Sequence, residues 1–156
     1  MSRTIDDIDT SILDMLQSNA RVTQAEIAKT VGLAPSAVME RLRKLEARGV
    51  IKEFTARIDP QTVELGLLAY VAVRSNEHGA EMPSAVQLSE IPEVLEVHHV
   101  AGDDCYLLKV RARDAEHLGQ LLRTRIASIP SVTSTRTTIV LETVKESTRL
   151  PIIGSR

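Results

Sequence analysis

Six basic residues lie between positions 41 and 57, where only two acidic residues are found. The basic residues are Arg41, Arg43, Lys44, Arg48, Lys52 and Arg57, and the acidic ones are Glu46 and Glu53. Guanidinium and ammonium groups bind phosphate oxygens, so this cationic segment favours contact with a nucleic-acid backbone. The whole chain of 156 residues has a formal net charge of -2, which excludes a generally basic surface. Binding must therefore come from this segment, and we expect more than one copy of it to take part.

The residues in and before this segment predict two short helices joined by a glycine turn. Thr23 and Glu26 have the spacing of a capping box, which starts a helix at Thr23. Gly32 can adopt the left-handed conformation that ends this helix. Pro35 suits the first position of a second helix, which we expect to end near Gly49. This order is typical of a helix-turn-helix, whose second helix enters the major groove of DNA.

The second helix has an apolar side and a polar side. The apolar positions with helical spacing are Pro35, Val38, Leu42 and Leu45. Ser36 and Met39 point away from them near the helix start, which reaches base edges in such proteins, and basic residues further along would meet phosphates. The predicted DNA contacts are Thr23, Gln24, Ser36, Met39, Glu40, Arg41, Arg43, Lys44 and Arg48. The alternative interpretation of this side is an ordinary solvated helix surface.

The chain is expected to form two domains. Helical spacing also relates Ile5, Ile8, Ile12 and Leu16, and Asp6 and Asp9 place negative charge where this helix starts. One helix therefore precedes the pair and completes a three-helix unit. We expect a DNA-binding domain over residues 1–52, a linker strand and loop over 53–66, and a second domain over 67–156. Residues 50–60 alternate apolar and polar side chains, which predicts an extended strand.

The second domain contains an internal repeat with an offset of 38 residues. Each half has a strand, a helix and a returning strand. We expect the strands at 68–74, 94–101, 106–112 and 132–143, and the helices at 82–89 and 115–127. The order βαββαβ is that of a ferredoxin-like sandwich. The predicted fold class is therefore α+β, with a winged helix-turn-helix domain followed by this sandwich.

The first strand of the sandwich is apolar in both of its alternating sets of side chains, from Leu67 to Val73. That pattern indicates burial on both faces of the sheet. A ferredoxin-like sheet carries helices on one face only, so another molecule has to cover the second face. Two-fold dimers are the commonest way to achieve this, and we therefore predict a homodimer.

Four segments resemble the leucine-responsive regulatory protein family, also called the Lrp/AsnC or feast/famine regulators. They are IDDIDTSILDMLQSNAR, LRKLEARGVIKEFTARIDP, VAGDDCYLLKVRARD and TRTTIVLETVKESTRLPI. The resemblance covers nearly the whole chain. It implies a transcriptional regulator of amino-acid metabolism genes that binds double-stranded DNA and is modulated by a small effector, commonly an amino acid. It also implies dimers that often assemble into octamers.

The resemblance places an effector loop between subunits, after the second strand of the sandwich. The predicted effector contacts are Gly102, Asp103, Asp104, Cys105, Thr135 and Thr137. The carboxylates suit an ammonium group and the threonines supply hydroxyls. The chain departs from the family twice: Cys105 replaces the second acidic residue of the loop, and Ala34 replaces the Ser or Thr that caps the second helix. The alternative interpretation of the loop is an ordinary polar turn.

Two other functions remain open at this stage. Sirohaem decarboxylases have a similar two-domain architecture, although a chain with no Trp, one Phe and two Tyr offers a poor lining for a large flat ring. The other alternative is a protein that wraps DNA without any effector, and the sequence does not separate it from a ligand-gated regulator.

We predict no catalytic residue, no cofactor and no metal site. His98 and His99 are adjacent on a strand, so they point to opposite faces and cannot bind one ion together. The chain has one cysteine, lacks the apolar segment of a secretory signal at its start, and has no apolar run of the ~20 residues that cross a bilayer. These features predict a cytoplasmic protein with no membrane partner.

Overall fold

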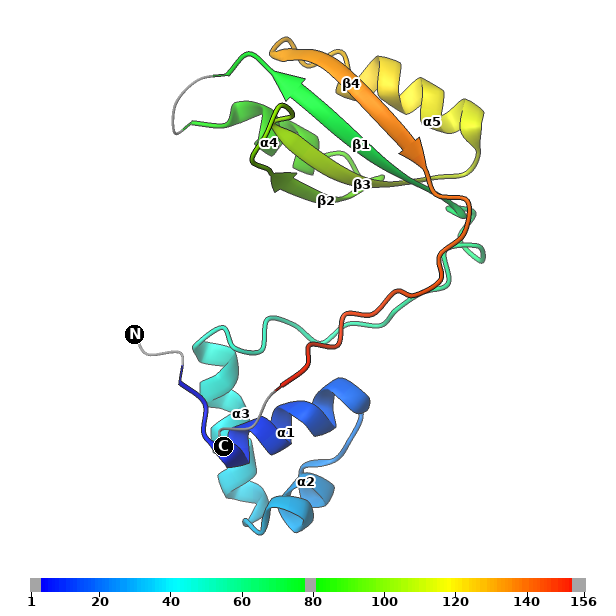
Figure 1. The fold of residues 1–156 in the computed structure, drawn as a ribbon. Coiled ribbons are helices and arrows are strands. Elements are labelled where there is room, and N and C mark those ends of the chain that lie inside the picture. The colour runs from blue at the N-terminus through cyan, green and yellow to red at the C-terminus, as the bar shows by residue number, and fades with distance from the viewer. Residues whose placement is uncertain (1–3, 78–80, 153–156) are drawn as a thin grey trace. The chain divides into compact units, whose positions relative to one another are not determined.

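The computed structural model describes residues 4–77 and 81–152. Their contacts divide the chain into two compact units, which are drawn in Figure 1. One unit contains the residues up to Arg57 together with those from Lys145 onward, and the other spans Ile58–Val144. The segment after Val144 therefore belongs to the helical unit, whereas the sequence analysis assigned it to the second domain.

Three helices form the first unit: α1 (Asp7–Ser18), α2 (Gln24–Val31) and α3 (Pro35–Ala47). They enclose a small core whose buried members are Ile12, Ile27, Ala28 and Val38. Ile12 and Val38 are fully buried. Ile8, Leu16 and Leu42 pack against this core and are partly buried. The predicted three-helix unit is confirmed, and its core depends on very few side chains.

Local signals define the ends of α1 and α2. The Thr23 hydroxyl accepts a hydrogen bond from the Glu26 amide, and the Glu26 carboxylate accepts one from the Thr23 amide, at 3.2 and 2.8 Å. Gly32 follows α2 with φ of 71°, a conformation that glycine adopts without the cost of a Cβ atom. Asp6 and Asp9 form a second capping box at the start of α1. Reciprocal hydrogen bonds therefore fix the starts of α1 and α2, and the left-handed conformation of Gly32 ends α2.

Helix α3 begins without a side-chain cap, since Ala34 occupies the position before Pro35. An Ala34→Ser variant supplies the missing acceptor, and we expect it to stabilise the helical unit by about 1 kcal/mol. Thermal unfolding followed by circular dichroism measures this gain as a rise of roughly 4–8 °C in Tm. Ala47→Ser, at the exposed end of the same helix, is the matched control. An equal rise in both variants would contradict the capping explanation.

The strand predicted for residues 50–60 is wrong. The described chain has no strand between α3 and β1 (Leu67–Ser75). An alternating pattern becomes a strand only when a neighbouring backbone receives its hydrogen bonds, and residues 50–60 pair with no strand among the described residues. The side chains of this segment instead meet the C-terminal segment, where Arg57 Nη2 lies 2.5 Å from Glu146 Oε1.

The second unit has the predicted βαββαβ order. Its elements are β1, α4 (Pro83–Ser89), β2 (Val94–His99), β3 (Tyr106–Ala112), α5 (Ala115–Leu121) and β4 (Val132–Ile139). Helix α5 continues into a π-helical segment, Leu122–Ile126. The four strands form one antiparallel sheet in the order β2-β3-β1-β4 (Figure 1). The ferredoxin-like prediction is confirmed, with β2 and β4 each shorter at the C-terminal end than expected.

The sheet has two unlike faces. Side chains that alternate along β1, namely Ala69, Val71 and Val73, pack in one core with residues of both helices such as Leu88 and Leu118. The other alternating set of β1 is Leu68, Tyr70 and Ala72. Leu68 and Ala72 are 6% and 7% exposed, and Tyr70 is 36% exposed. The face opposite the helices is therefore apolar along its central strand, as the sequence predicts.

The C-terminal segment is fastened to α1. Gln17 donates a hydrogen bond from Nε2 to the Leu150 carbonyl at 3.0 Å and accepts one from the Leu150 amide at 2.7 Å. Arg149 Nη2 lies 2.6 Å from Asp14 Oδ1. The end of the described chain is thus part of the helical unit. No helix among residues 4–77 and 81–152 is long and apolar enough to cross a membrane.

Candidate nucleic-acid interface and effector loop

Helix α3 presents its polar side to solvent. Val38 and Leu45 are buried on the opposite side, at 0% and 1% exposure, and Leu42 is half-buried. The exposed residues are Ser36, Met39, Glu40, Arg43 and Lys44. Met39 is a large apolar side chain that is 54% exposed, so it is accessible to a ligand on this face. The structure therefore brings these five predicted DNA contacts onto one accessible face.

Two cations of this face share one carboxylate. Arg43 Nη2 and Nε lie 2.8 and 3.0 Å from the two oxygens of Glu40, and Lys44 Nζ lies 3.5 Å from Glu40 Oε1. The hydrogen bond from Arg43 holds the pKa of Glu40 at about 2, so this group stays ionised at neutral pH. The three side chains have a net charge of +1 and are all exposed. Phosphate oxygens can replace Glu40 as the partner of Arg43, because both offer the same acceptor geometry.

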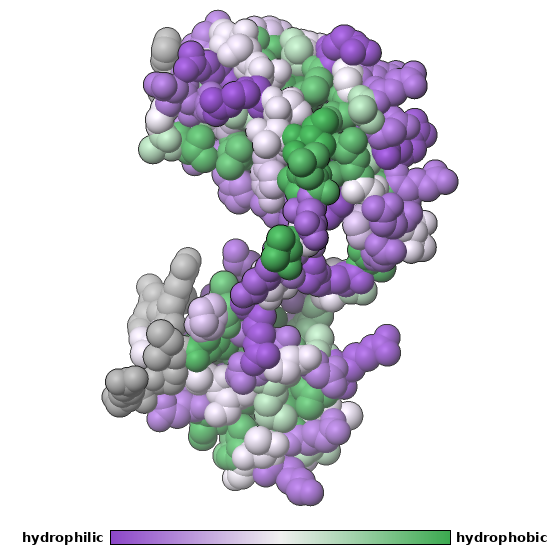
Figure 2. All heavy atoms as spheres, turned by 45° about the vertical axis from the view of Figure 1, so that its right-hand side comes forward, coloured by the Kyte–Doolittle hydropathy of each residue, from purple (hydrophilic) through white to green (hydrophobic). Residues whose placement is uncertain are grey.

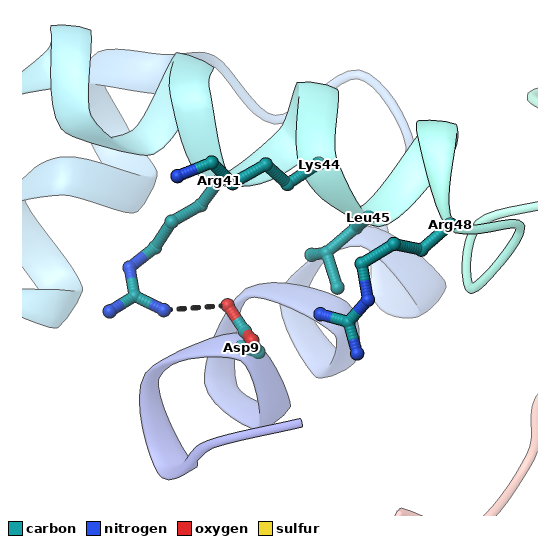
Figure 3. Close-up of a pocket in the computed structure, with 5 residues that line it drawn as sticks. All are labelled: Asp9, Arg41, Lys44, Leu45 and Arg48. Carbon is teal, nitrogen blue, oxygen red and sulfur yellow. Dashed lines mark hydrogen bonds and ion pairs between the residues drawn. The ribbon is translucent and has the colours of Figure 1, made fainter. Parts of the chain in front are cut away.

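Arg41 and Arg48 lie on a different side of α3. Figure 3 shows that both side chains point toward α1 rather than along the exposed face. Arg41 Nη1 is 2.8 Å from an oxygen of Asp6 and 2.8 Å from an oxygen of Asp9. Arg48 Nη2 donates to the Thr4 carbonyl at 2.7 Å. The six basic residues of the sequence cluster therefore do not form one surface.

The two predicted contacts from α2 lie at its first turn. The Thr23 hydroxyl is engaged with Glu26, to which it also donates a hydrogen bond at 2.8 Å. Gln24 is exposed at the first position of the helix. Thr23 therefore shapes the helix start, while the Gln24 side chain is accessible to a ligand.

The predicted effector loop follows β2 and is rich in ion pairs. Asp104 Oδ2 accepts from Arg136 Nη2 at 2.9 Å, and Asp104 Oδ1 lies 3.7 Å from Arg74 Nε. Asp103 Oδ2 is 3.9 Å from Arg74 Nη2, and its side chain is 94% exposed. Gly102 has φ of 120°, which only glycine adopts readily, so it shapes the turn that presents the two carboxylates. The loop thus places anionic and cationic groups side by side.

The remaining predicted effector residues point elsewhere. The Cys105 sulfur accepts from the Ser75 amide at 3.3 Å, so the thiol is directed at the backbone of β1. Thr135 and Thr137 lie opposite Val73 and Val71 in the sheet register, which puts their side chains on the helix-covered face. Arg136, between them, points to the other face, where it meets Asp104. The structure therefore groups the aspartates with arginines and not with the threonines.

Arg74 in β1 and Arg136 in β4 lie beside this loop and were not predicted as part of the site. Both arginines come from strands that are distant in sequence from Asp104. The alternation of side chains along β4 offered a signal, because it separates Arg136 from Thr135 and Thr137. The pairing of β4 with β1, which brings Ala72 opposite Arg136, was needed to place Arg136 beside the loop.

A polar cluster where the central strands β1 and β3 meet α4 was also not predicted. Glu77 accepts hydrogen bonds from the Ser84 hydroxyl at 2.6 Å and from the Tyr106 hydroxyl at 3.0 Å, and Ser84 also meets Ser131. Burial and the bond to Glu77 raise the pKa of Tyr106 to about 12. Burial raises the pKa of Glu77, but the hydrogen bonds from Ser84 and Tyr106 outweigh it and the net pKa is lowered. These partners hold β1, α4 and β3 together, so we assign the cluster a structural role.

The two histidines are separated as expected. His98 Nε2 lies 3.0 Å from Glu96 Oε2, whereas the His99 ring contacts the Tyr106 ring at 5.7 Å between centroids. Within the described ranges, no group of three or more His, Cys, Asp or Glu residues is arranged to hold a metal ion.

Two family models match the chain, and together they span most of it. A model described as winged helix-turn-helix DNA-binding matches residues 5–52. A model described as Lrp/AsnC ligand binding domain matches residues 68–150. Their boundary coincides with the segment that joins the helical unit to the sheet.

Curated relatives and solved structures agree with these matches. The HTH-type transcriptional regulator FL11 of Pyrococcus horikoshii is 42% identical over 148 residues, which cover 95% of this chain and 97% of that protein. The leucine-responsive regulatory protein of Escherichia coli K12 is 38% identical over 154 residues, covering 96% of this chain and 93% of that protein.

The structural comparison extends to both units. A feast or famine regulatory protein from Mycobacterium tuberculosis, solved as a complex with L-methionine, is similar with a TM-score of 0.86 and 37% identity, over 94% of this chain and 99% of that one. Helix order, sheet topology and the two matched family models all indicate the same family. This chain belongs to the Lrp/AsnC family of transcriptional regulators, with a winged helix-turn-helix domain and an α+β ligand-binding domain.

Proposed function

We propose that the exposed face of α3 reads double-stranded DNA, with Ser36 and Met39 at base edges and Arg43 and Lys44 on phosphates. The observation that carries this proposal is the accessible side of α3, where a large apolar residue and a net positive charge lie together on a rigid helix. Base edges are contacted near the start of a recognition helix, and phosphates fix its register. Gln24 is accessible at the start of α2 and completes the face.

A small amino acid is the proposed effector, bound at Asp103, Asp104 and the neighbouring arginines. A free amino acid carries an ammonium and a carboxylate, and this loop offers both complementary charges. The M. tuberculosis relative was solved with L-methionine, which supports an amino acid as the ligand class. Cys105 supplies no charge in the family's second acidic position, so Asp104 takes that role in the proposal. Thr135 and Thr137 lie on the opposite, helix-covered face of the sheet, so the proposed site does not include them.

We also propose that the chain acts as a homodimer, and that dimers assemble further, as the resemblance to the family implies. The face of β1 opposite the helices is apolar, and the sheet unit exposes further large apolar residues, including Val86, Leu95, Ile139 and Leu141. Figure 2 shows a group of apolar side chains that form a patch on the surface of the sheet unit. Patches of this kind mark interfaces in soluble proteins. Two copies would present two α3 helices to successive grooves.

A cytoplasmic site of action and the absence of catalysis complete the proposal. The relatives named above are transcriptional regulators. Nothing in the arrangement of the described residues favours the tetrapyrrole enzyme over a regulator. Effector-independent wrapping of DNA differs from the proposal only in its response to ligand.

The proposal is tested by anisotropy of labelled duplex fragments from the upstream regions of the organism's own genes. We expect binding at low salt that weakens as salt is added, and a change in affinity or assembly with at least one member of a full amino-acid panel. Sedimentation in the same buffers follows the assembly. Failure to bind any fragment at low salt excludes the DNA-reading role. Binding that no amino acid alters excludes the effector and leaves wrapping.

A further inference from the structure

We infer that Arg41 is a positioning residue of the recognition helix: it completes the capping box of α1 from α3 and thereby fixes the face that carries Met39 and Arg43. This inference rests on the proposed DNA-reading role of α3. It also reverses the phosphate-binding role that the sequence predicts for Arg41. Four hydrogen bonds, the burial of Asp9 and the sum of the local charges support the positioning role.

The four carboxylate oxygens of Asp6 and Asp9 are divided between two tasks. Asp6 Oδ1 accepts from the Asp9 amide at 2.7 Å, and Asp9 Oδ2 accepts from the Asp6 amide at 3.5 Å. The other oxygen of each residue accepts from Arg41 Nη1, both at 2.8 Å. A capping box normally satisfies amides of its own helix only. Here the same pair of carboxylates also binds a neighbouring helix, so the start of α1 and the middle of α3 are joined at one nitrogen.

The charges of this trio make it unsuited to phosphate. Arg41, Asp6 and Asp9 sum to -1, whereas Glu40, Arg43 and Lys44 on the exposed face sum to +1. A phosphate that approached Arg41 would also meet two carboxylates at contact distance from the guanidinium. The Asp9 side chain is only 10% exposed and that of Arg41 is 30% exposed, so water screens the pair of Arg41 and Asp9 less than it screens the exposed face. Electrostatics therefore divides α3 into a binding side and an anchoring side.

A second contact, made by Arg48, helps to fix the rotation of α3 about its own axis. Arg41 and Arg48 are seven residues apart, which is about two helical turns, and Leu45 lies between them and is 1% exposed. Arg48 donates to the Thr4 carbonyl just before α1. Figure 3 shows the two arginines reaching toward α1 on either side of Leu45. Two polar contacts that flank a buried apolar one resist rotation of α3 about its own axis, and such a rotation would move Met39 away from the bases.

The test compares Arg41→Met and Asp9→Asn in the full-length protein, using the duplex selected by the wild type and a random duplex of equal length. Each variant is expected to weaken binding to the selected duplex about tenfold, which is the scale of a single base contact. Binding to the random duplex should change less than twofold, and the dependence of affinity on salt should keep its slope. Asp9→Asn separates the two roles by the direction of the change in affinity. Removal of a negative charge alone should strengthen binding to DNA, whereas loss of a charge that positions α3 should weaken it.

Coupling and rescue separate positioning from loss of folding. The double variant should bind the selected duplex no more weakly than either single variant, since the same ion pair has been removed from both ends. Arg41→Lys keeps a cation near both carboxylates and should recover part of the affinity. If Arg41→Met does not fold, Arg41→Lys and Asp6→Asn carry the comparison, because Asp6 is half-exposed and its loss leaves no buried charge. A general loss of protein stability would weaken binding to both duplexes equally.

The inference is overturned if Arg41→Met lowers the salt slope by about 0.9 for each copy of Arg41 in the DNA-bound assembly while Asp9→Asn leaves binding unchanged or stronger. That outcome makes Arg41 a phosphate contact and leaves the DNA-reading role intact. A wild type that binds no duplex removes the proposed function itself, and with it the role of Arg41.

Discussion

Replacement of Ile12 by alanine is expected to destabilise the helical unit strongly while the sheet unit keeps its stability. Ile12 is fully buried in a core with only four buried members. Truncation of a buried Ile costs about 2–5 kcal/mol, because it loses transfer free energy and leaves a cavity. A unit of this size has a total stability of only about 3–9 kcal/mol on the usual scale per residue. The Tm of α1, α2 and α3 should therefore fall steeply in the variant, and DNA binding should be lost at a lower temperature than in the wild type.

The composition of the chain allows the two units to be followed separately. The chain has no Trp, and its two tyrosines, Tyr70 and Tyr106, both lie in the sheet. Tyrosine fluorescence therefore reports the sheet unit, whereas α1, α2 and α3 supply most of the helical signal in circular dichroism. The matched control is Ile58→Ala, at a side chain that is 65% exposed. If Ile12→Ala lowers the Tm seen by tyrosine fluorescence by as much as the Tm seen by circular dichroism, the two units do not unfold independently.

The local signals of the sequence were sufficient for most of the fold. Thr23, Glu26 and Gly32 define α2 through contacts that span three or four residues, so their effect does not depend on the rest of the chain. The βαββαβ order could also be predicted, because the alternation of side chains and the internal repeat mark each strand. The ends of β2 and β4 could not be predicted. A strand ends where its neighbour no longer pairs with it, and the register with β3 and β1 sets that point.

Segments that depend on distant partners could not be assigned from the sequence. Residues 50–60 alternate like a strand, yet no described strand pairs with them. The return of the C-terminal segment to the helical unit rests on the contact between Gln17 and Leu150, which are 133 positions apart. Neither a glutamine nor a leucine in the sequence predicts such a contact. The same limitation applies to the effector loop, where Arg74 and Arg136 reach Asp104 from two other strands.

The side of α3 on which Arg41 lies could have been predicted from the sequence. Val38, Arg41, Leu45 and Arg48 follow one another at intervals of three, four and three, which places them on one side of a helix. A count of basic residues over a segment does not distinguish the two sides of the helix, so it assigns Arg41 to the binding surface. Two acidic residues at the start of the first helix supply the partner that a buried-side arginine needs. Periodicity therefore had to be applied to the basic residues as well as to the apolar ones.

Removing both cations of the exposed face should produce the largest loss of DNA affinity. For the Arg43→Ala and Lys44→Ala double variant we expect the slope of log affinity against log salt to fall by about 0.9 for each phosphate that is no longer neutralised. That slope corresponds to roughly an eightfold loss per phosphate at 0.1 M salt, or on the order of 10³-fold for the four phosphates that a dimer would neutralise with these cations. The loss should be similar for the selected and the random duplex, since phosphates are common to both.

Three comparison variants make this result specific to the face of α3. Arg125→Ala removes one positive charge from an exposed site in the sheet unit and should leave the slope almost unchanged. Met39→Ala should change the preferred sequence without changing the slope, because an apolar contact releases no counterion. Glu40→Gln should strengthen binding, since it frees Arg43 and Lys44 from their shared carboxylate. Because Glu40 has a pKa of about 2, its wild-type influence should be constant between pH 5 and 9. A double variant with an unchanged slope would place the phosphates on another surface of the protein.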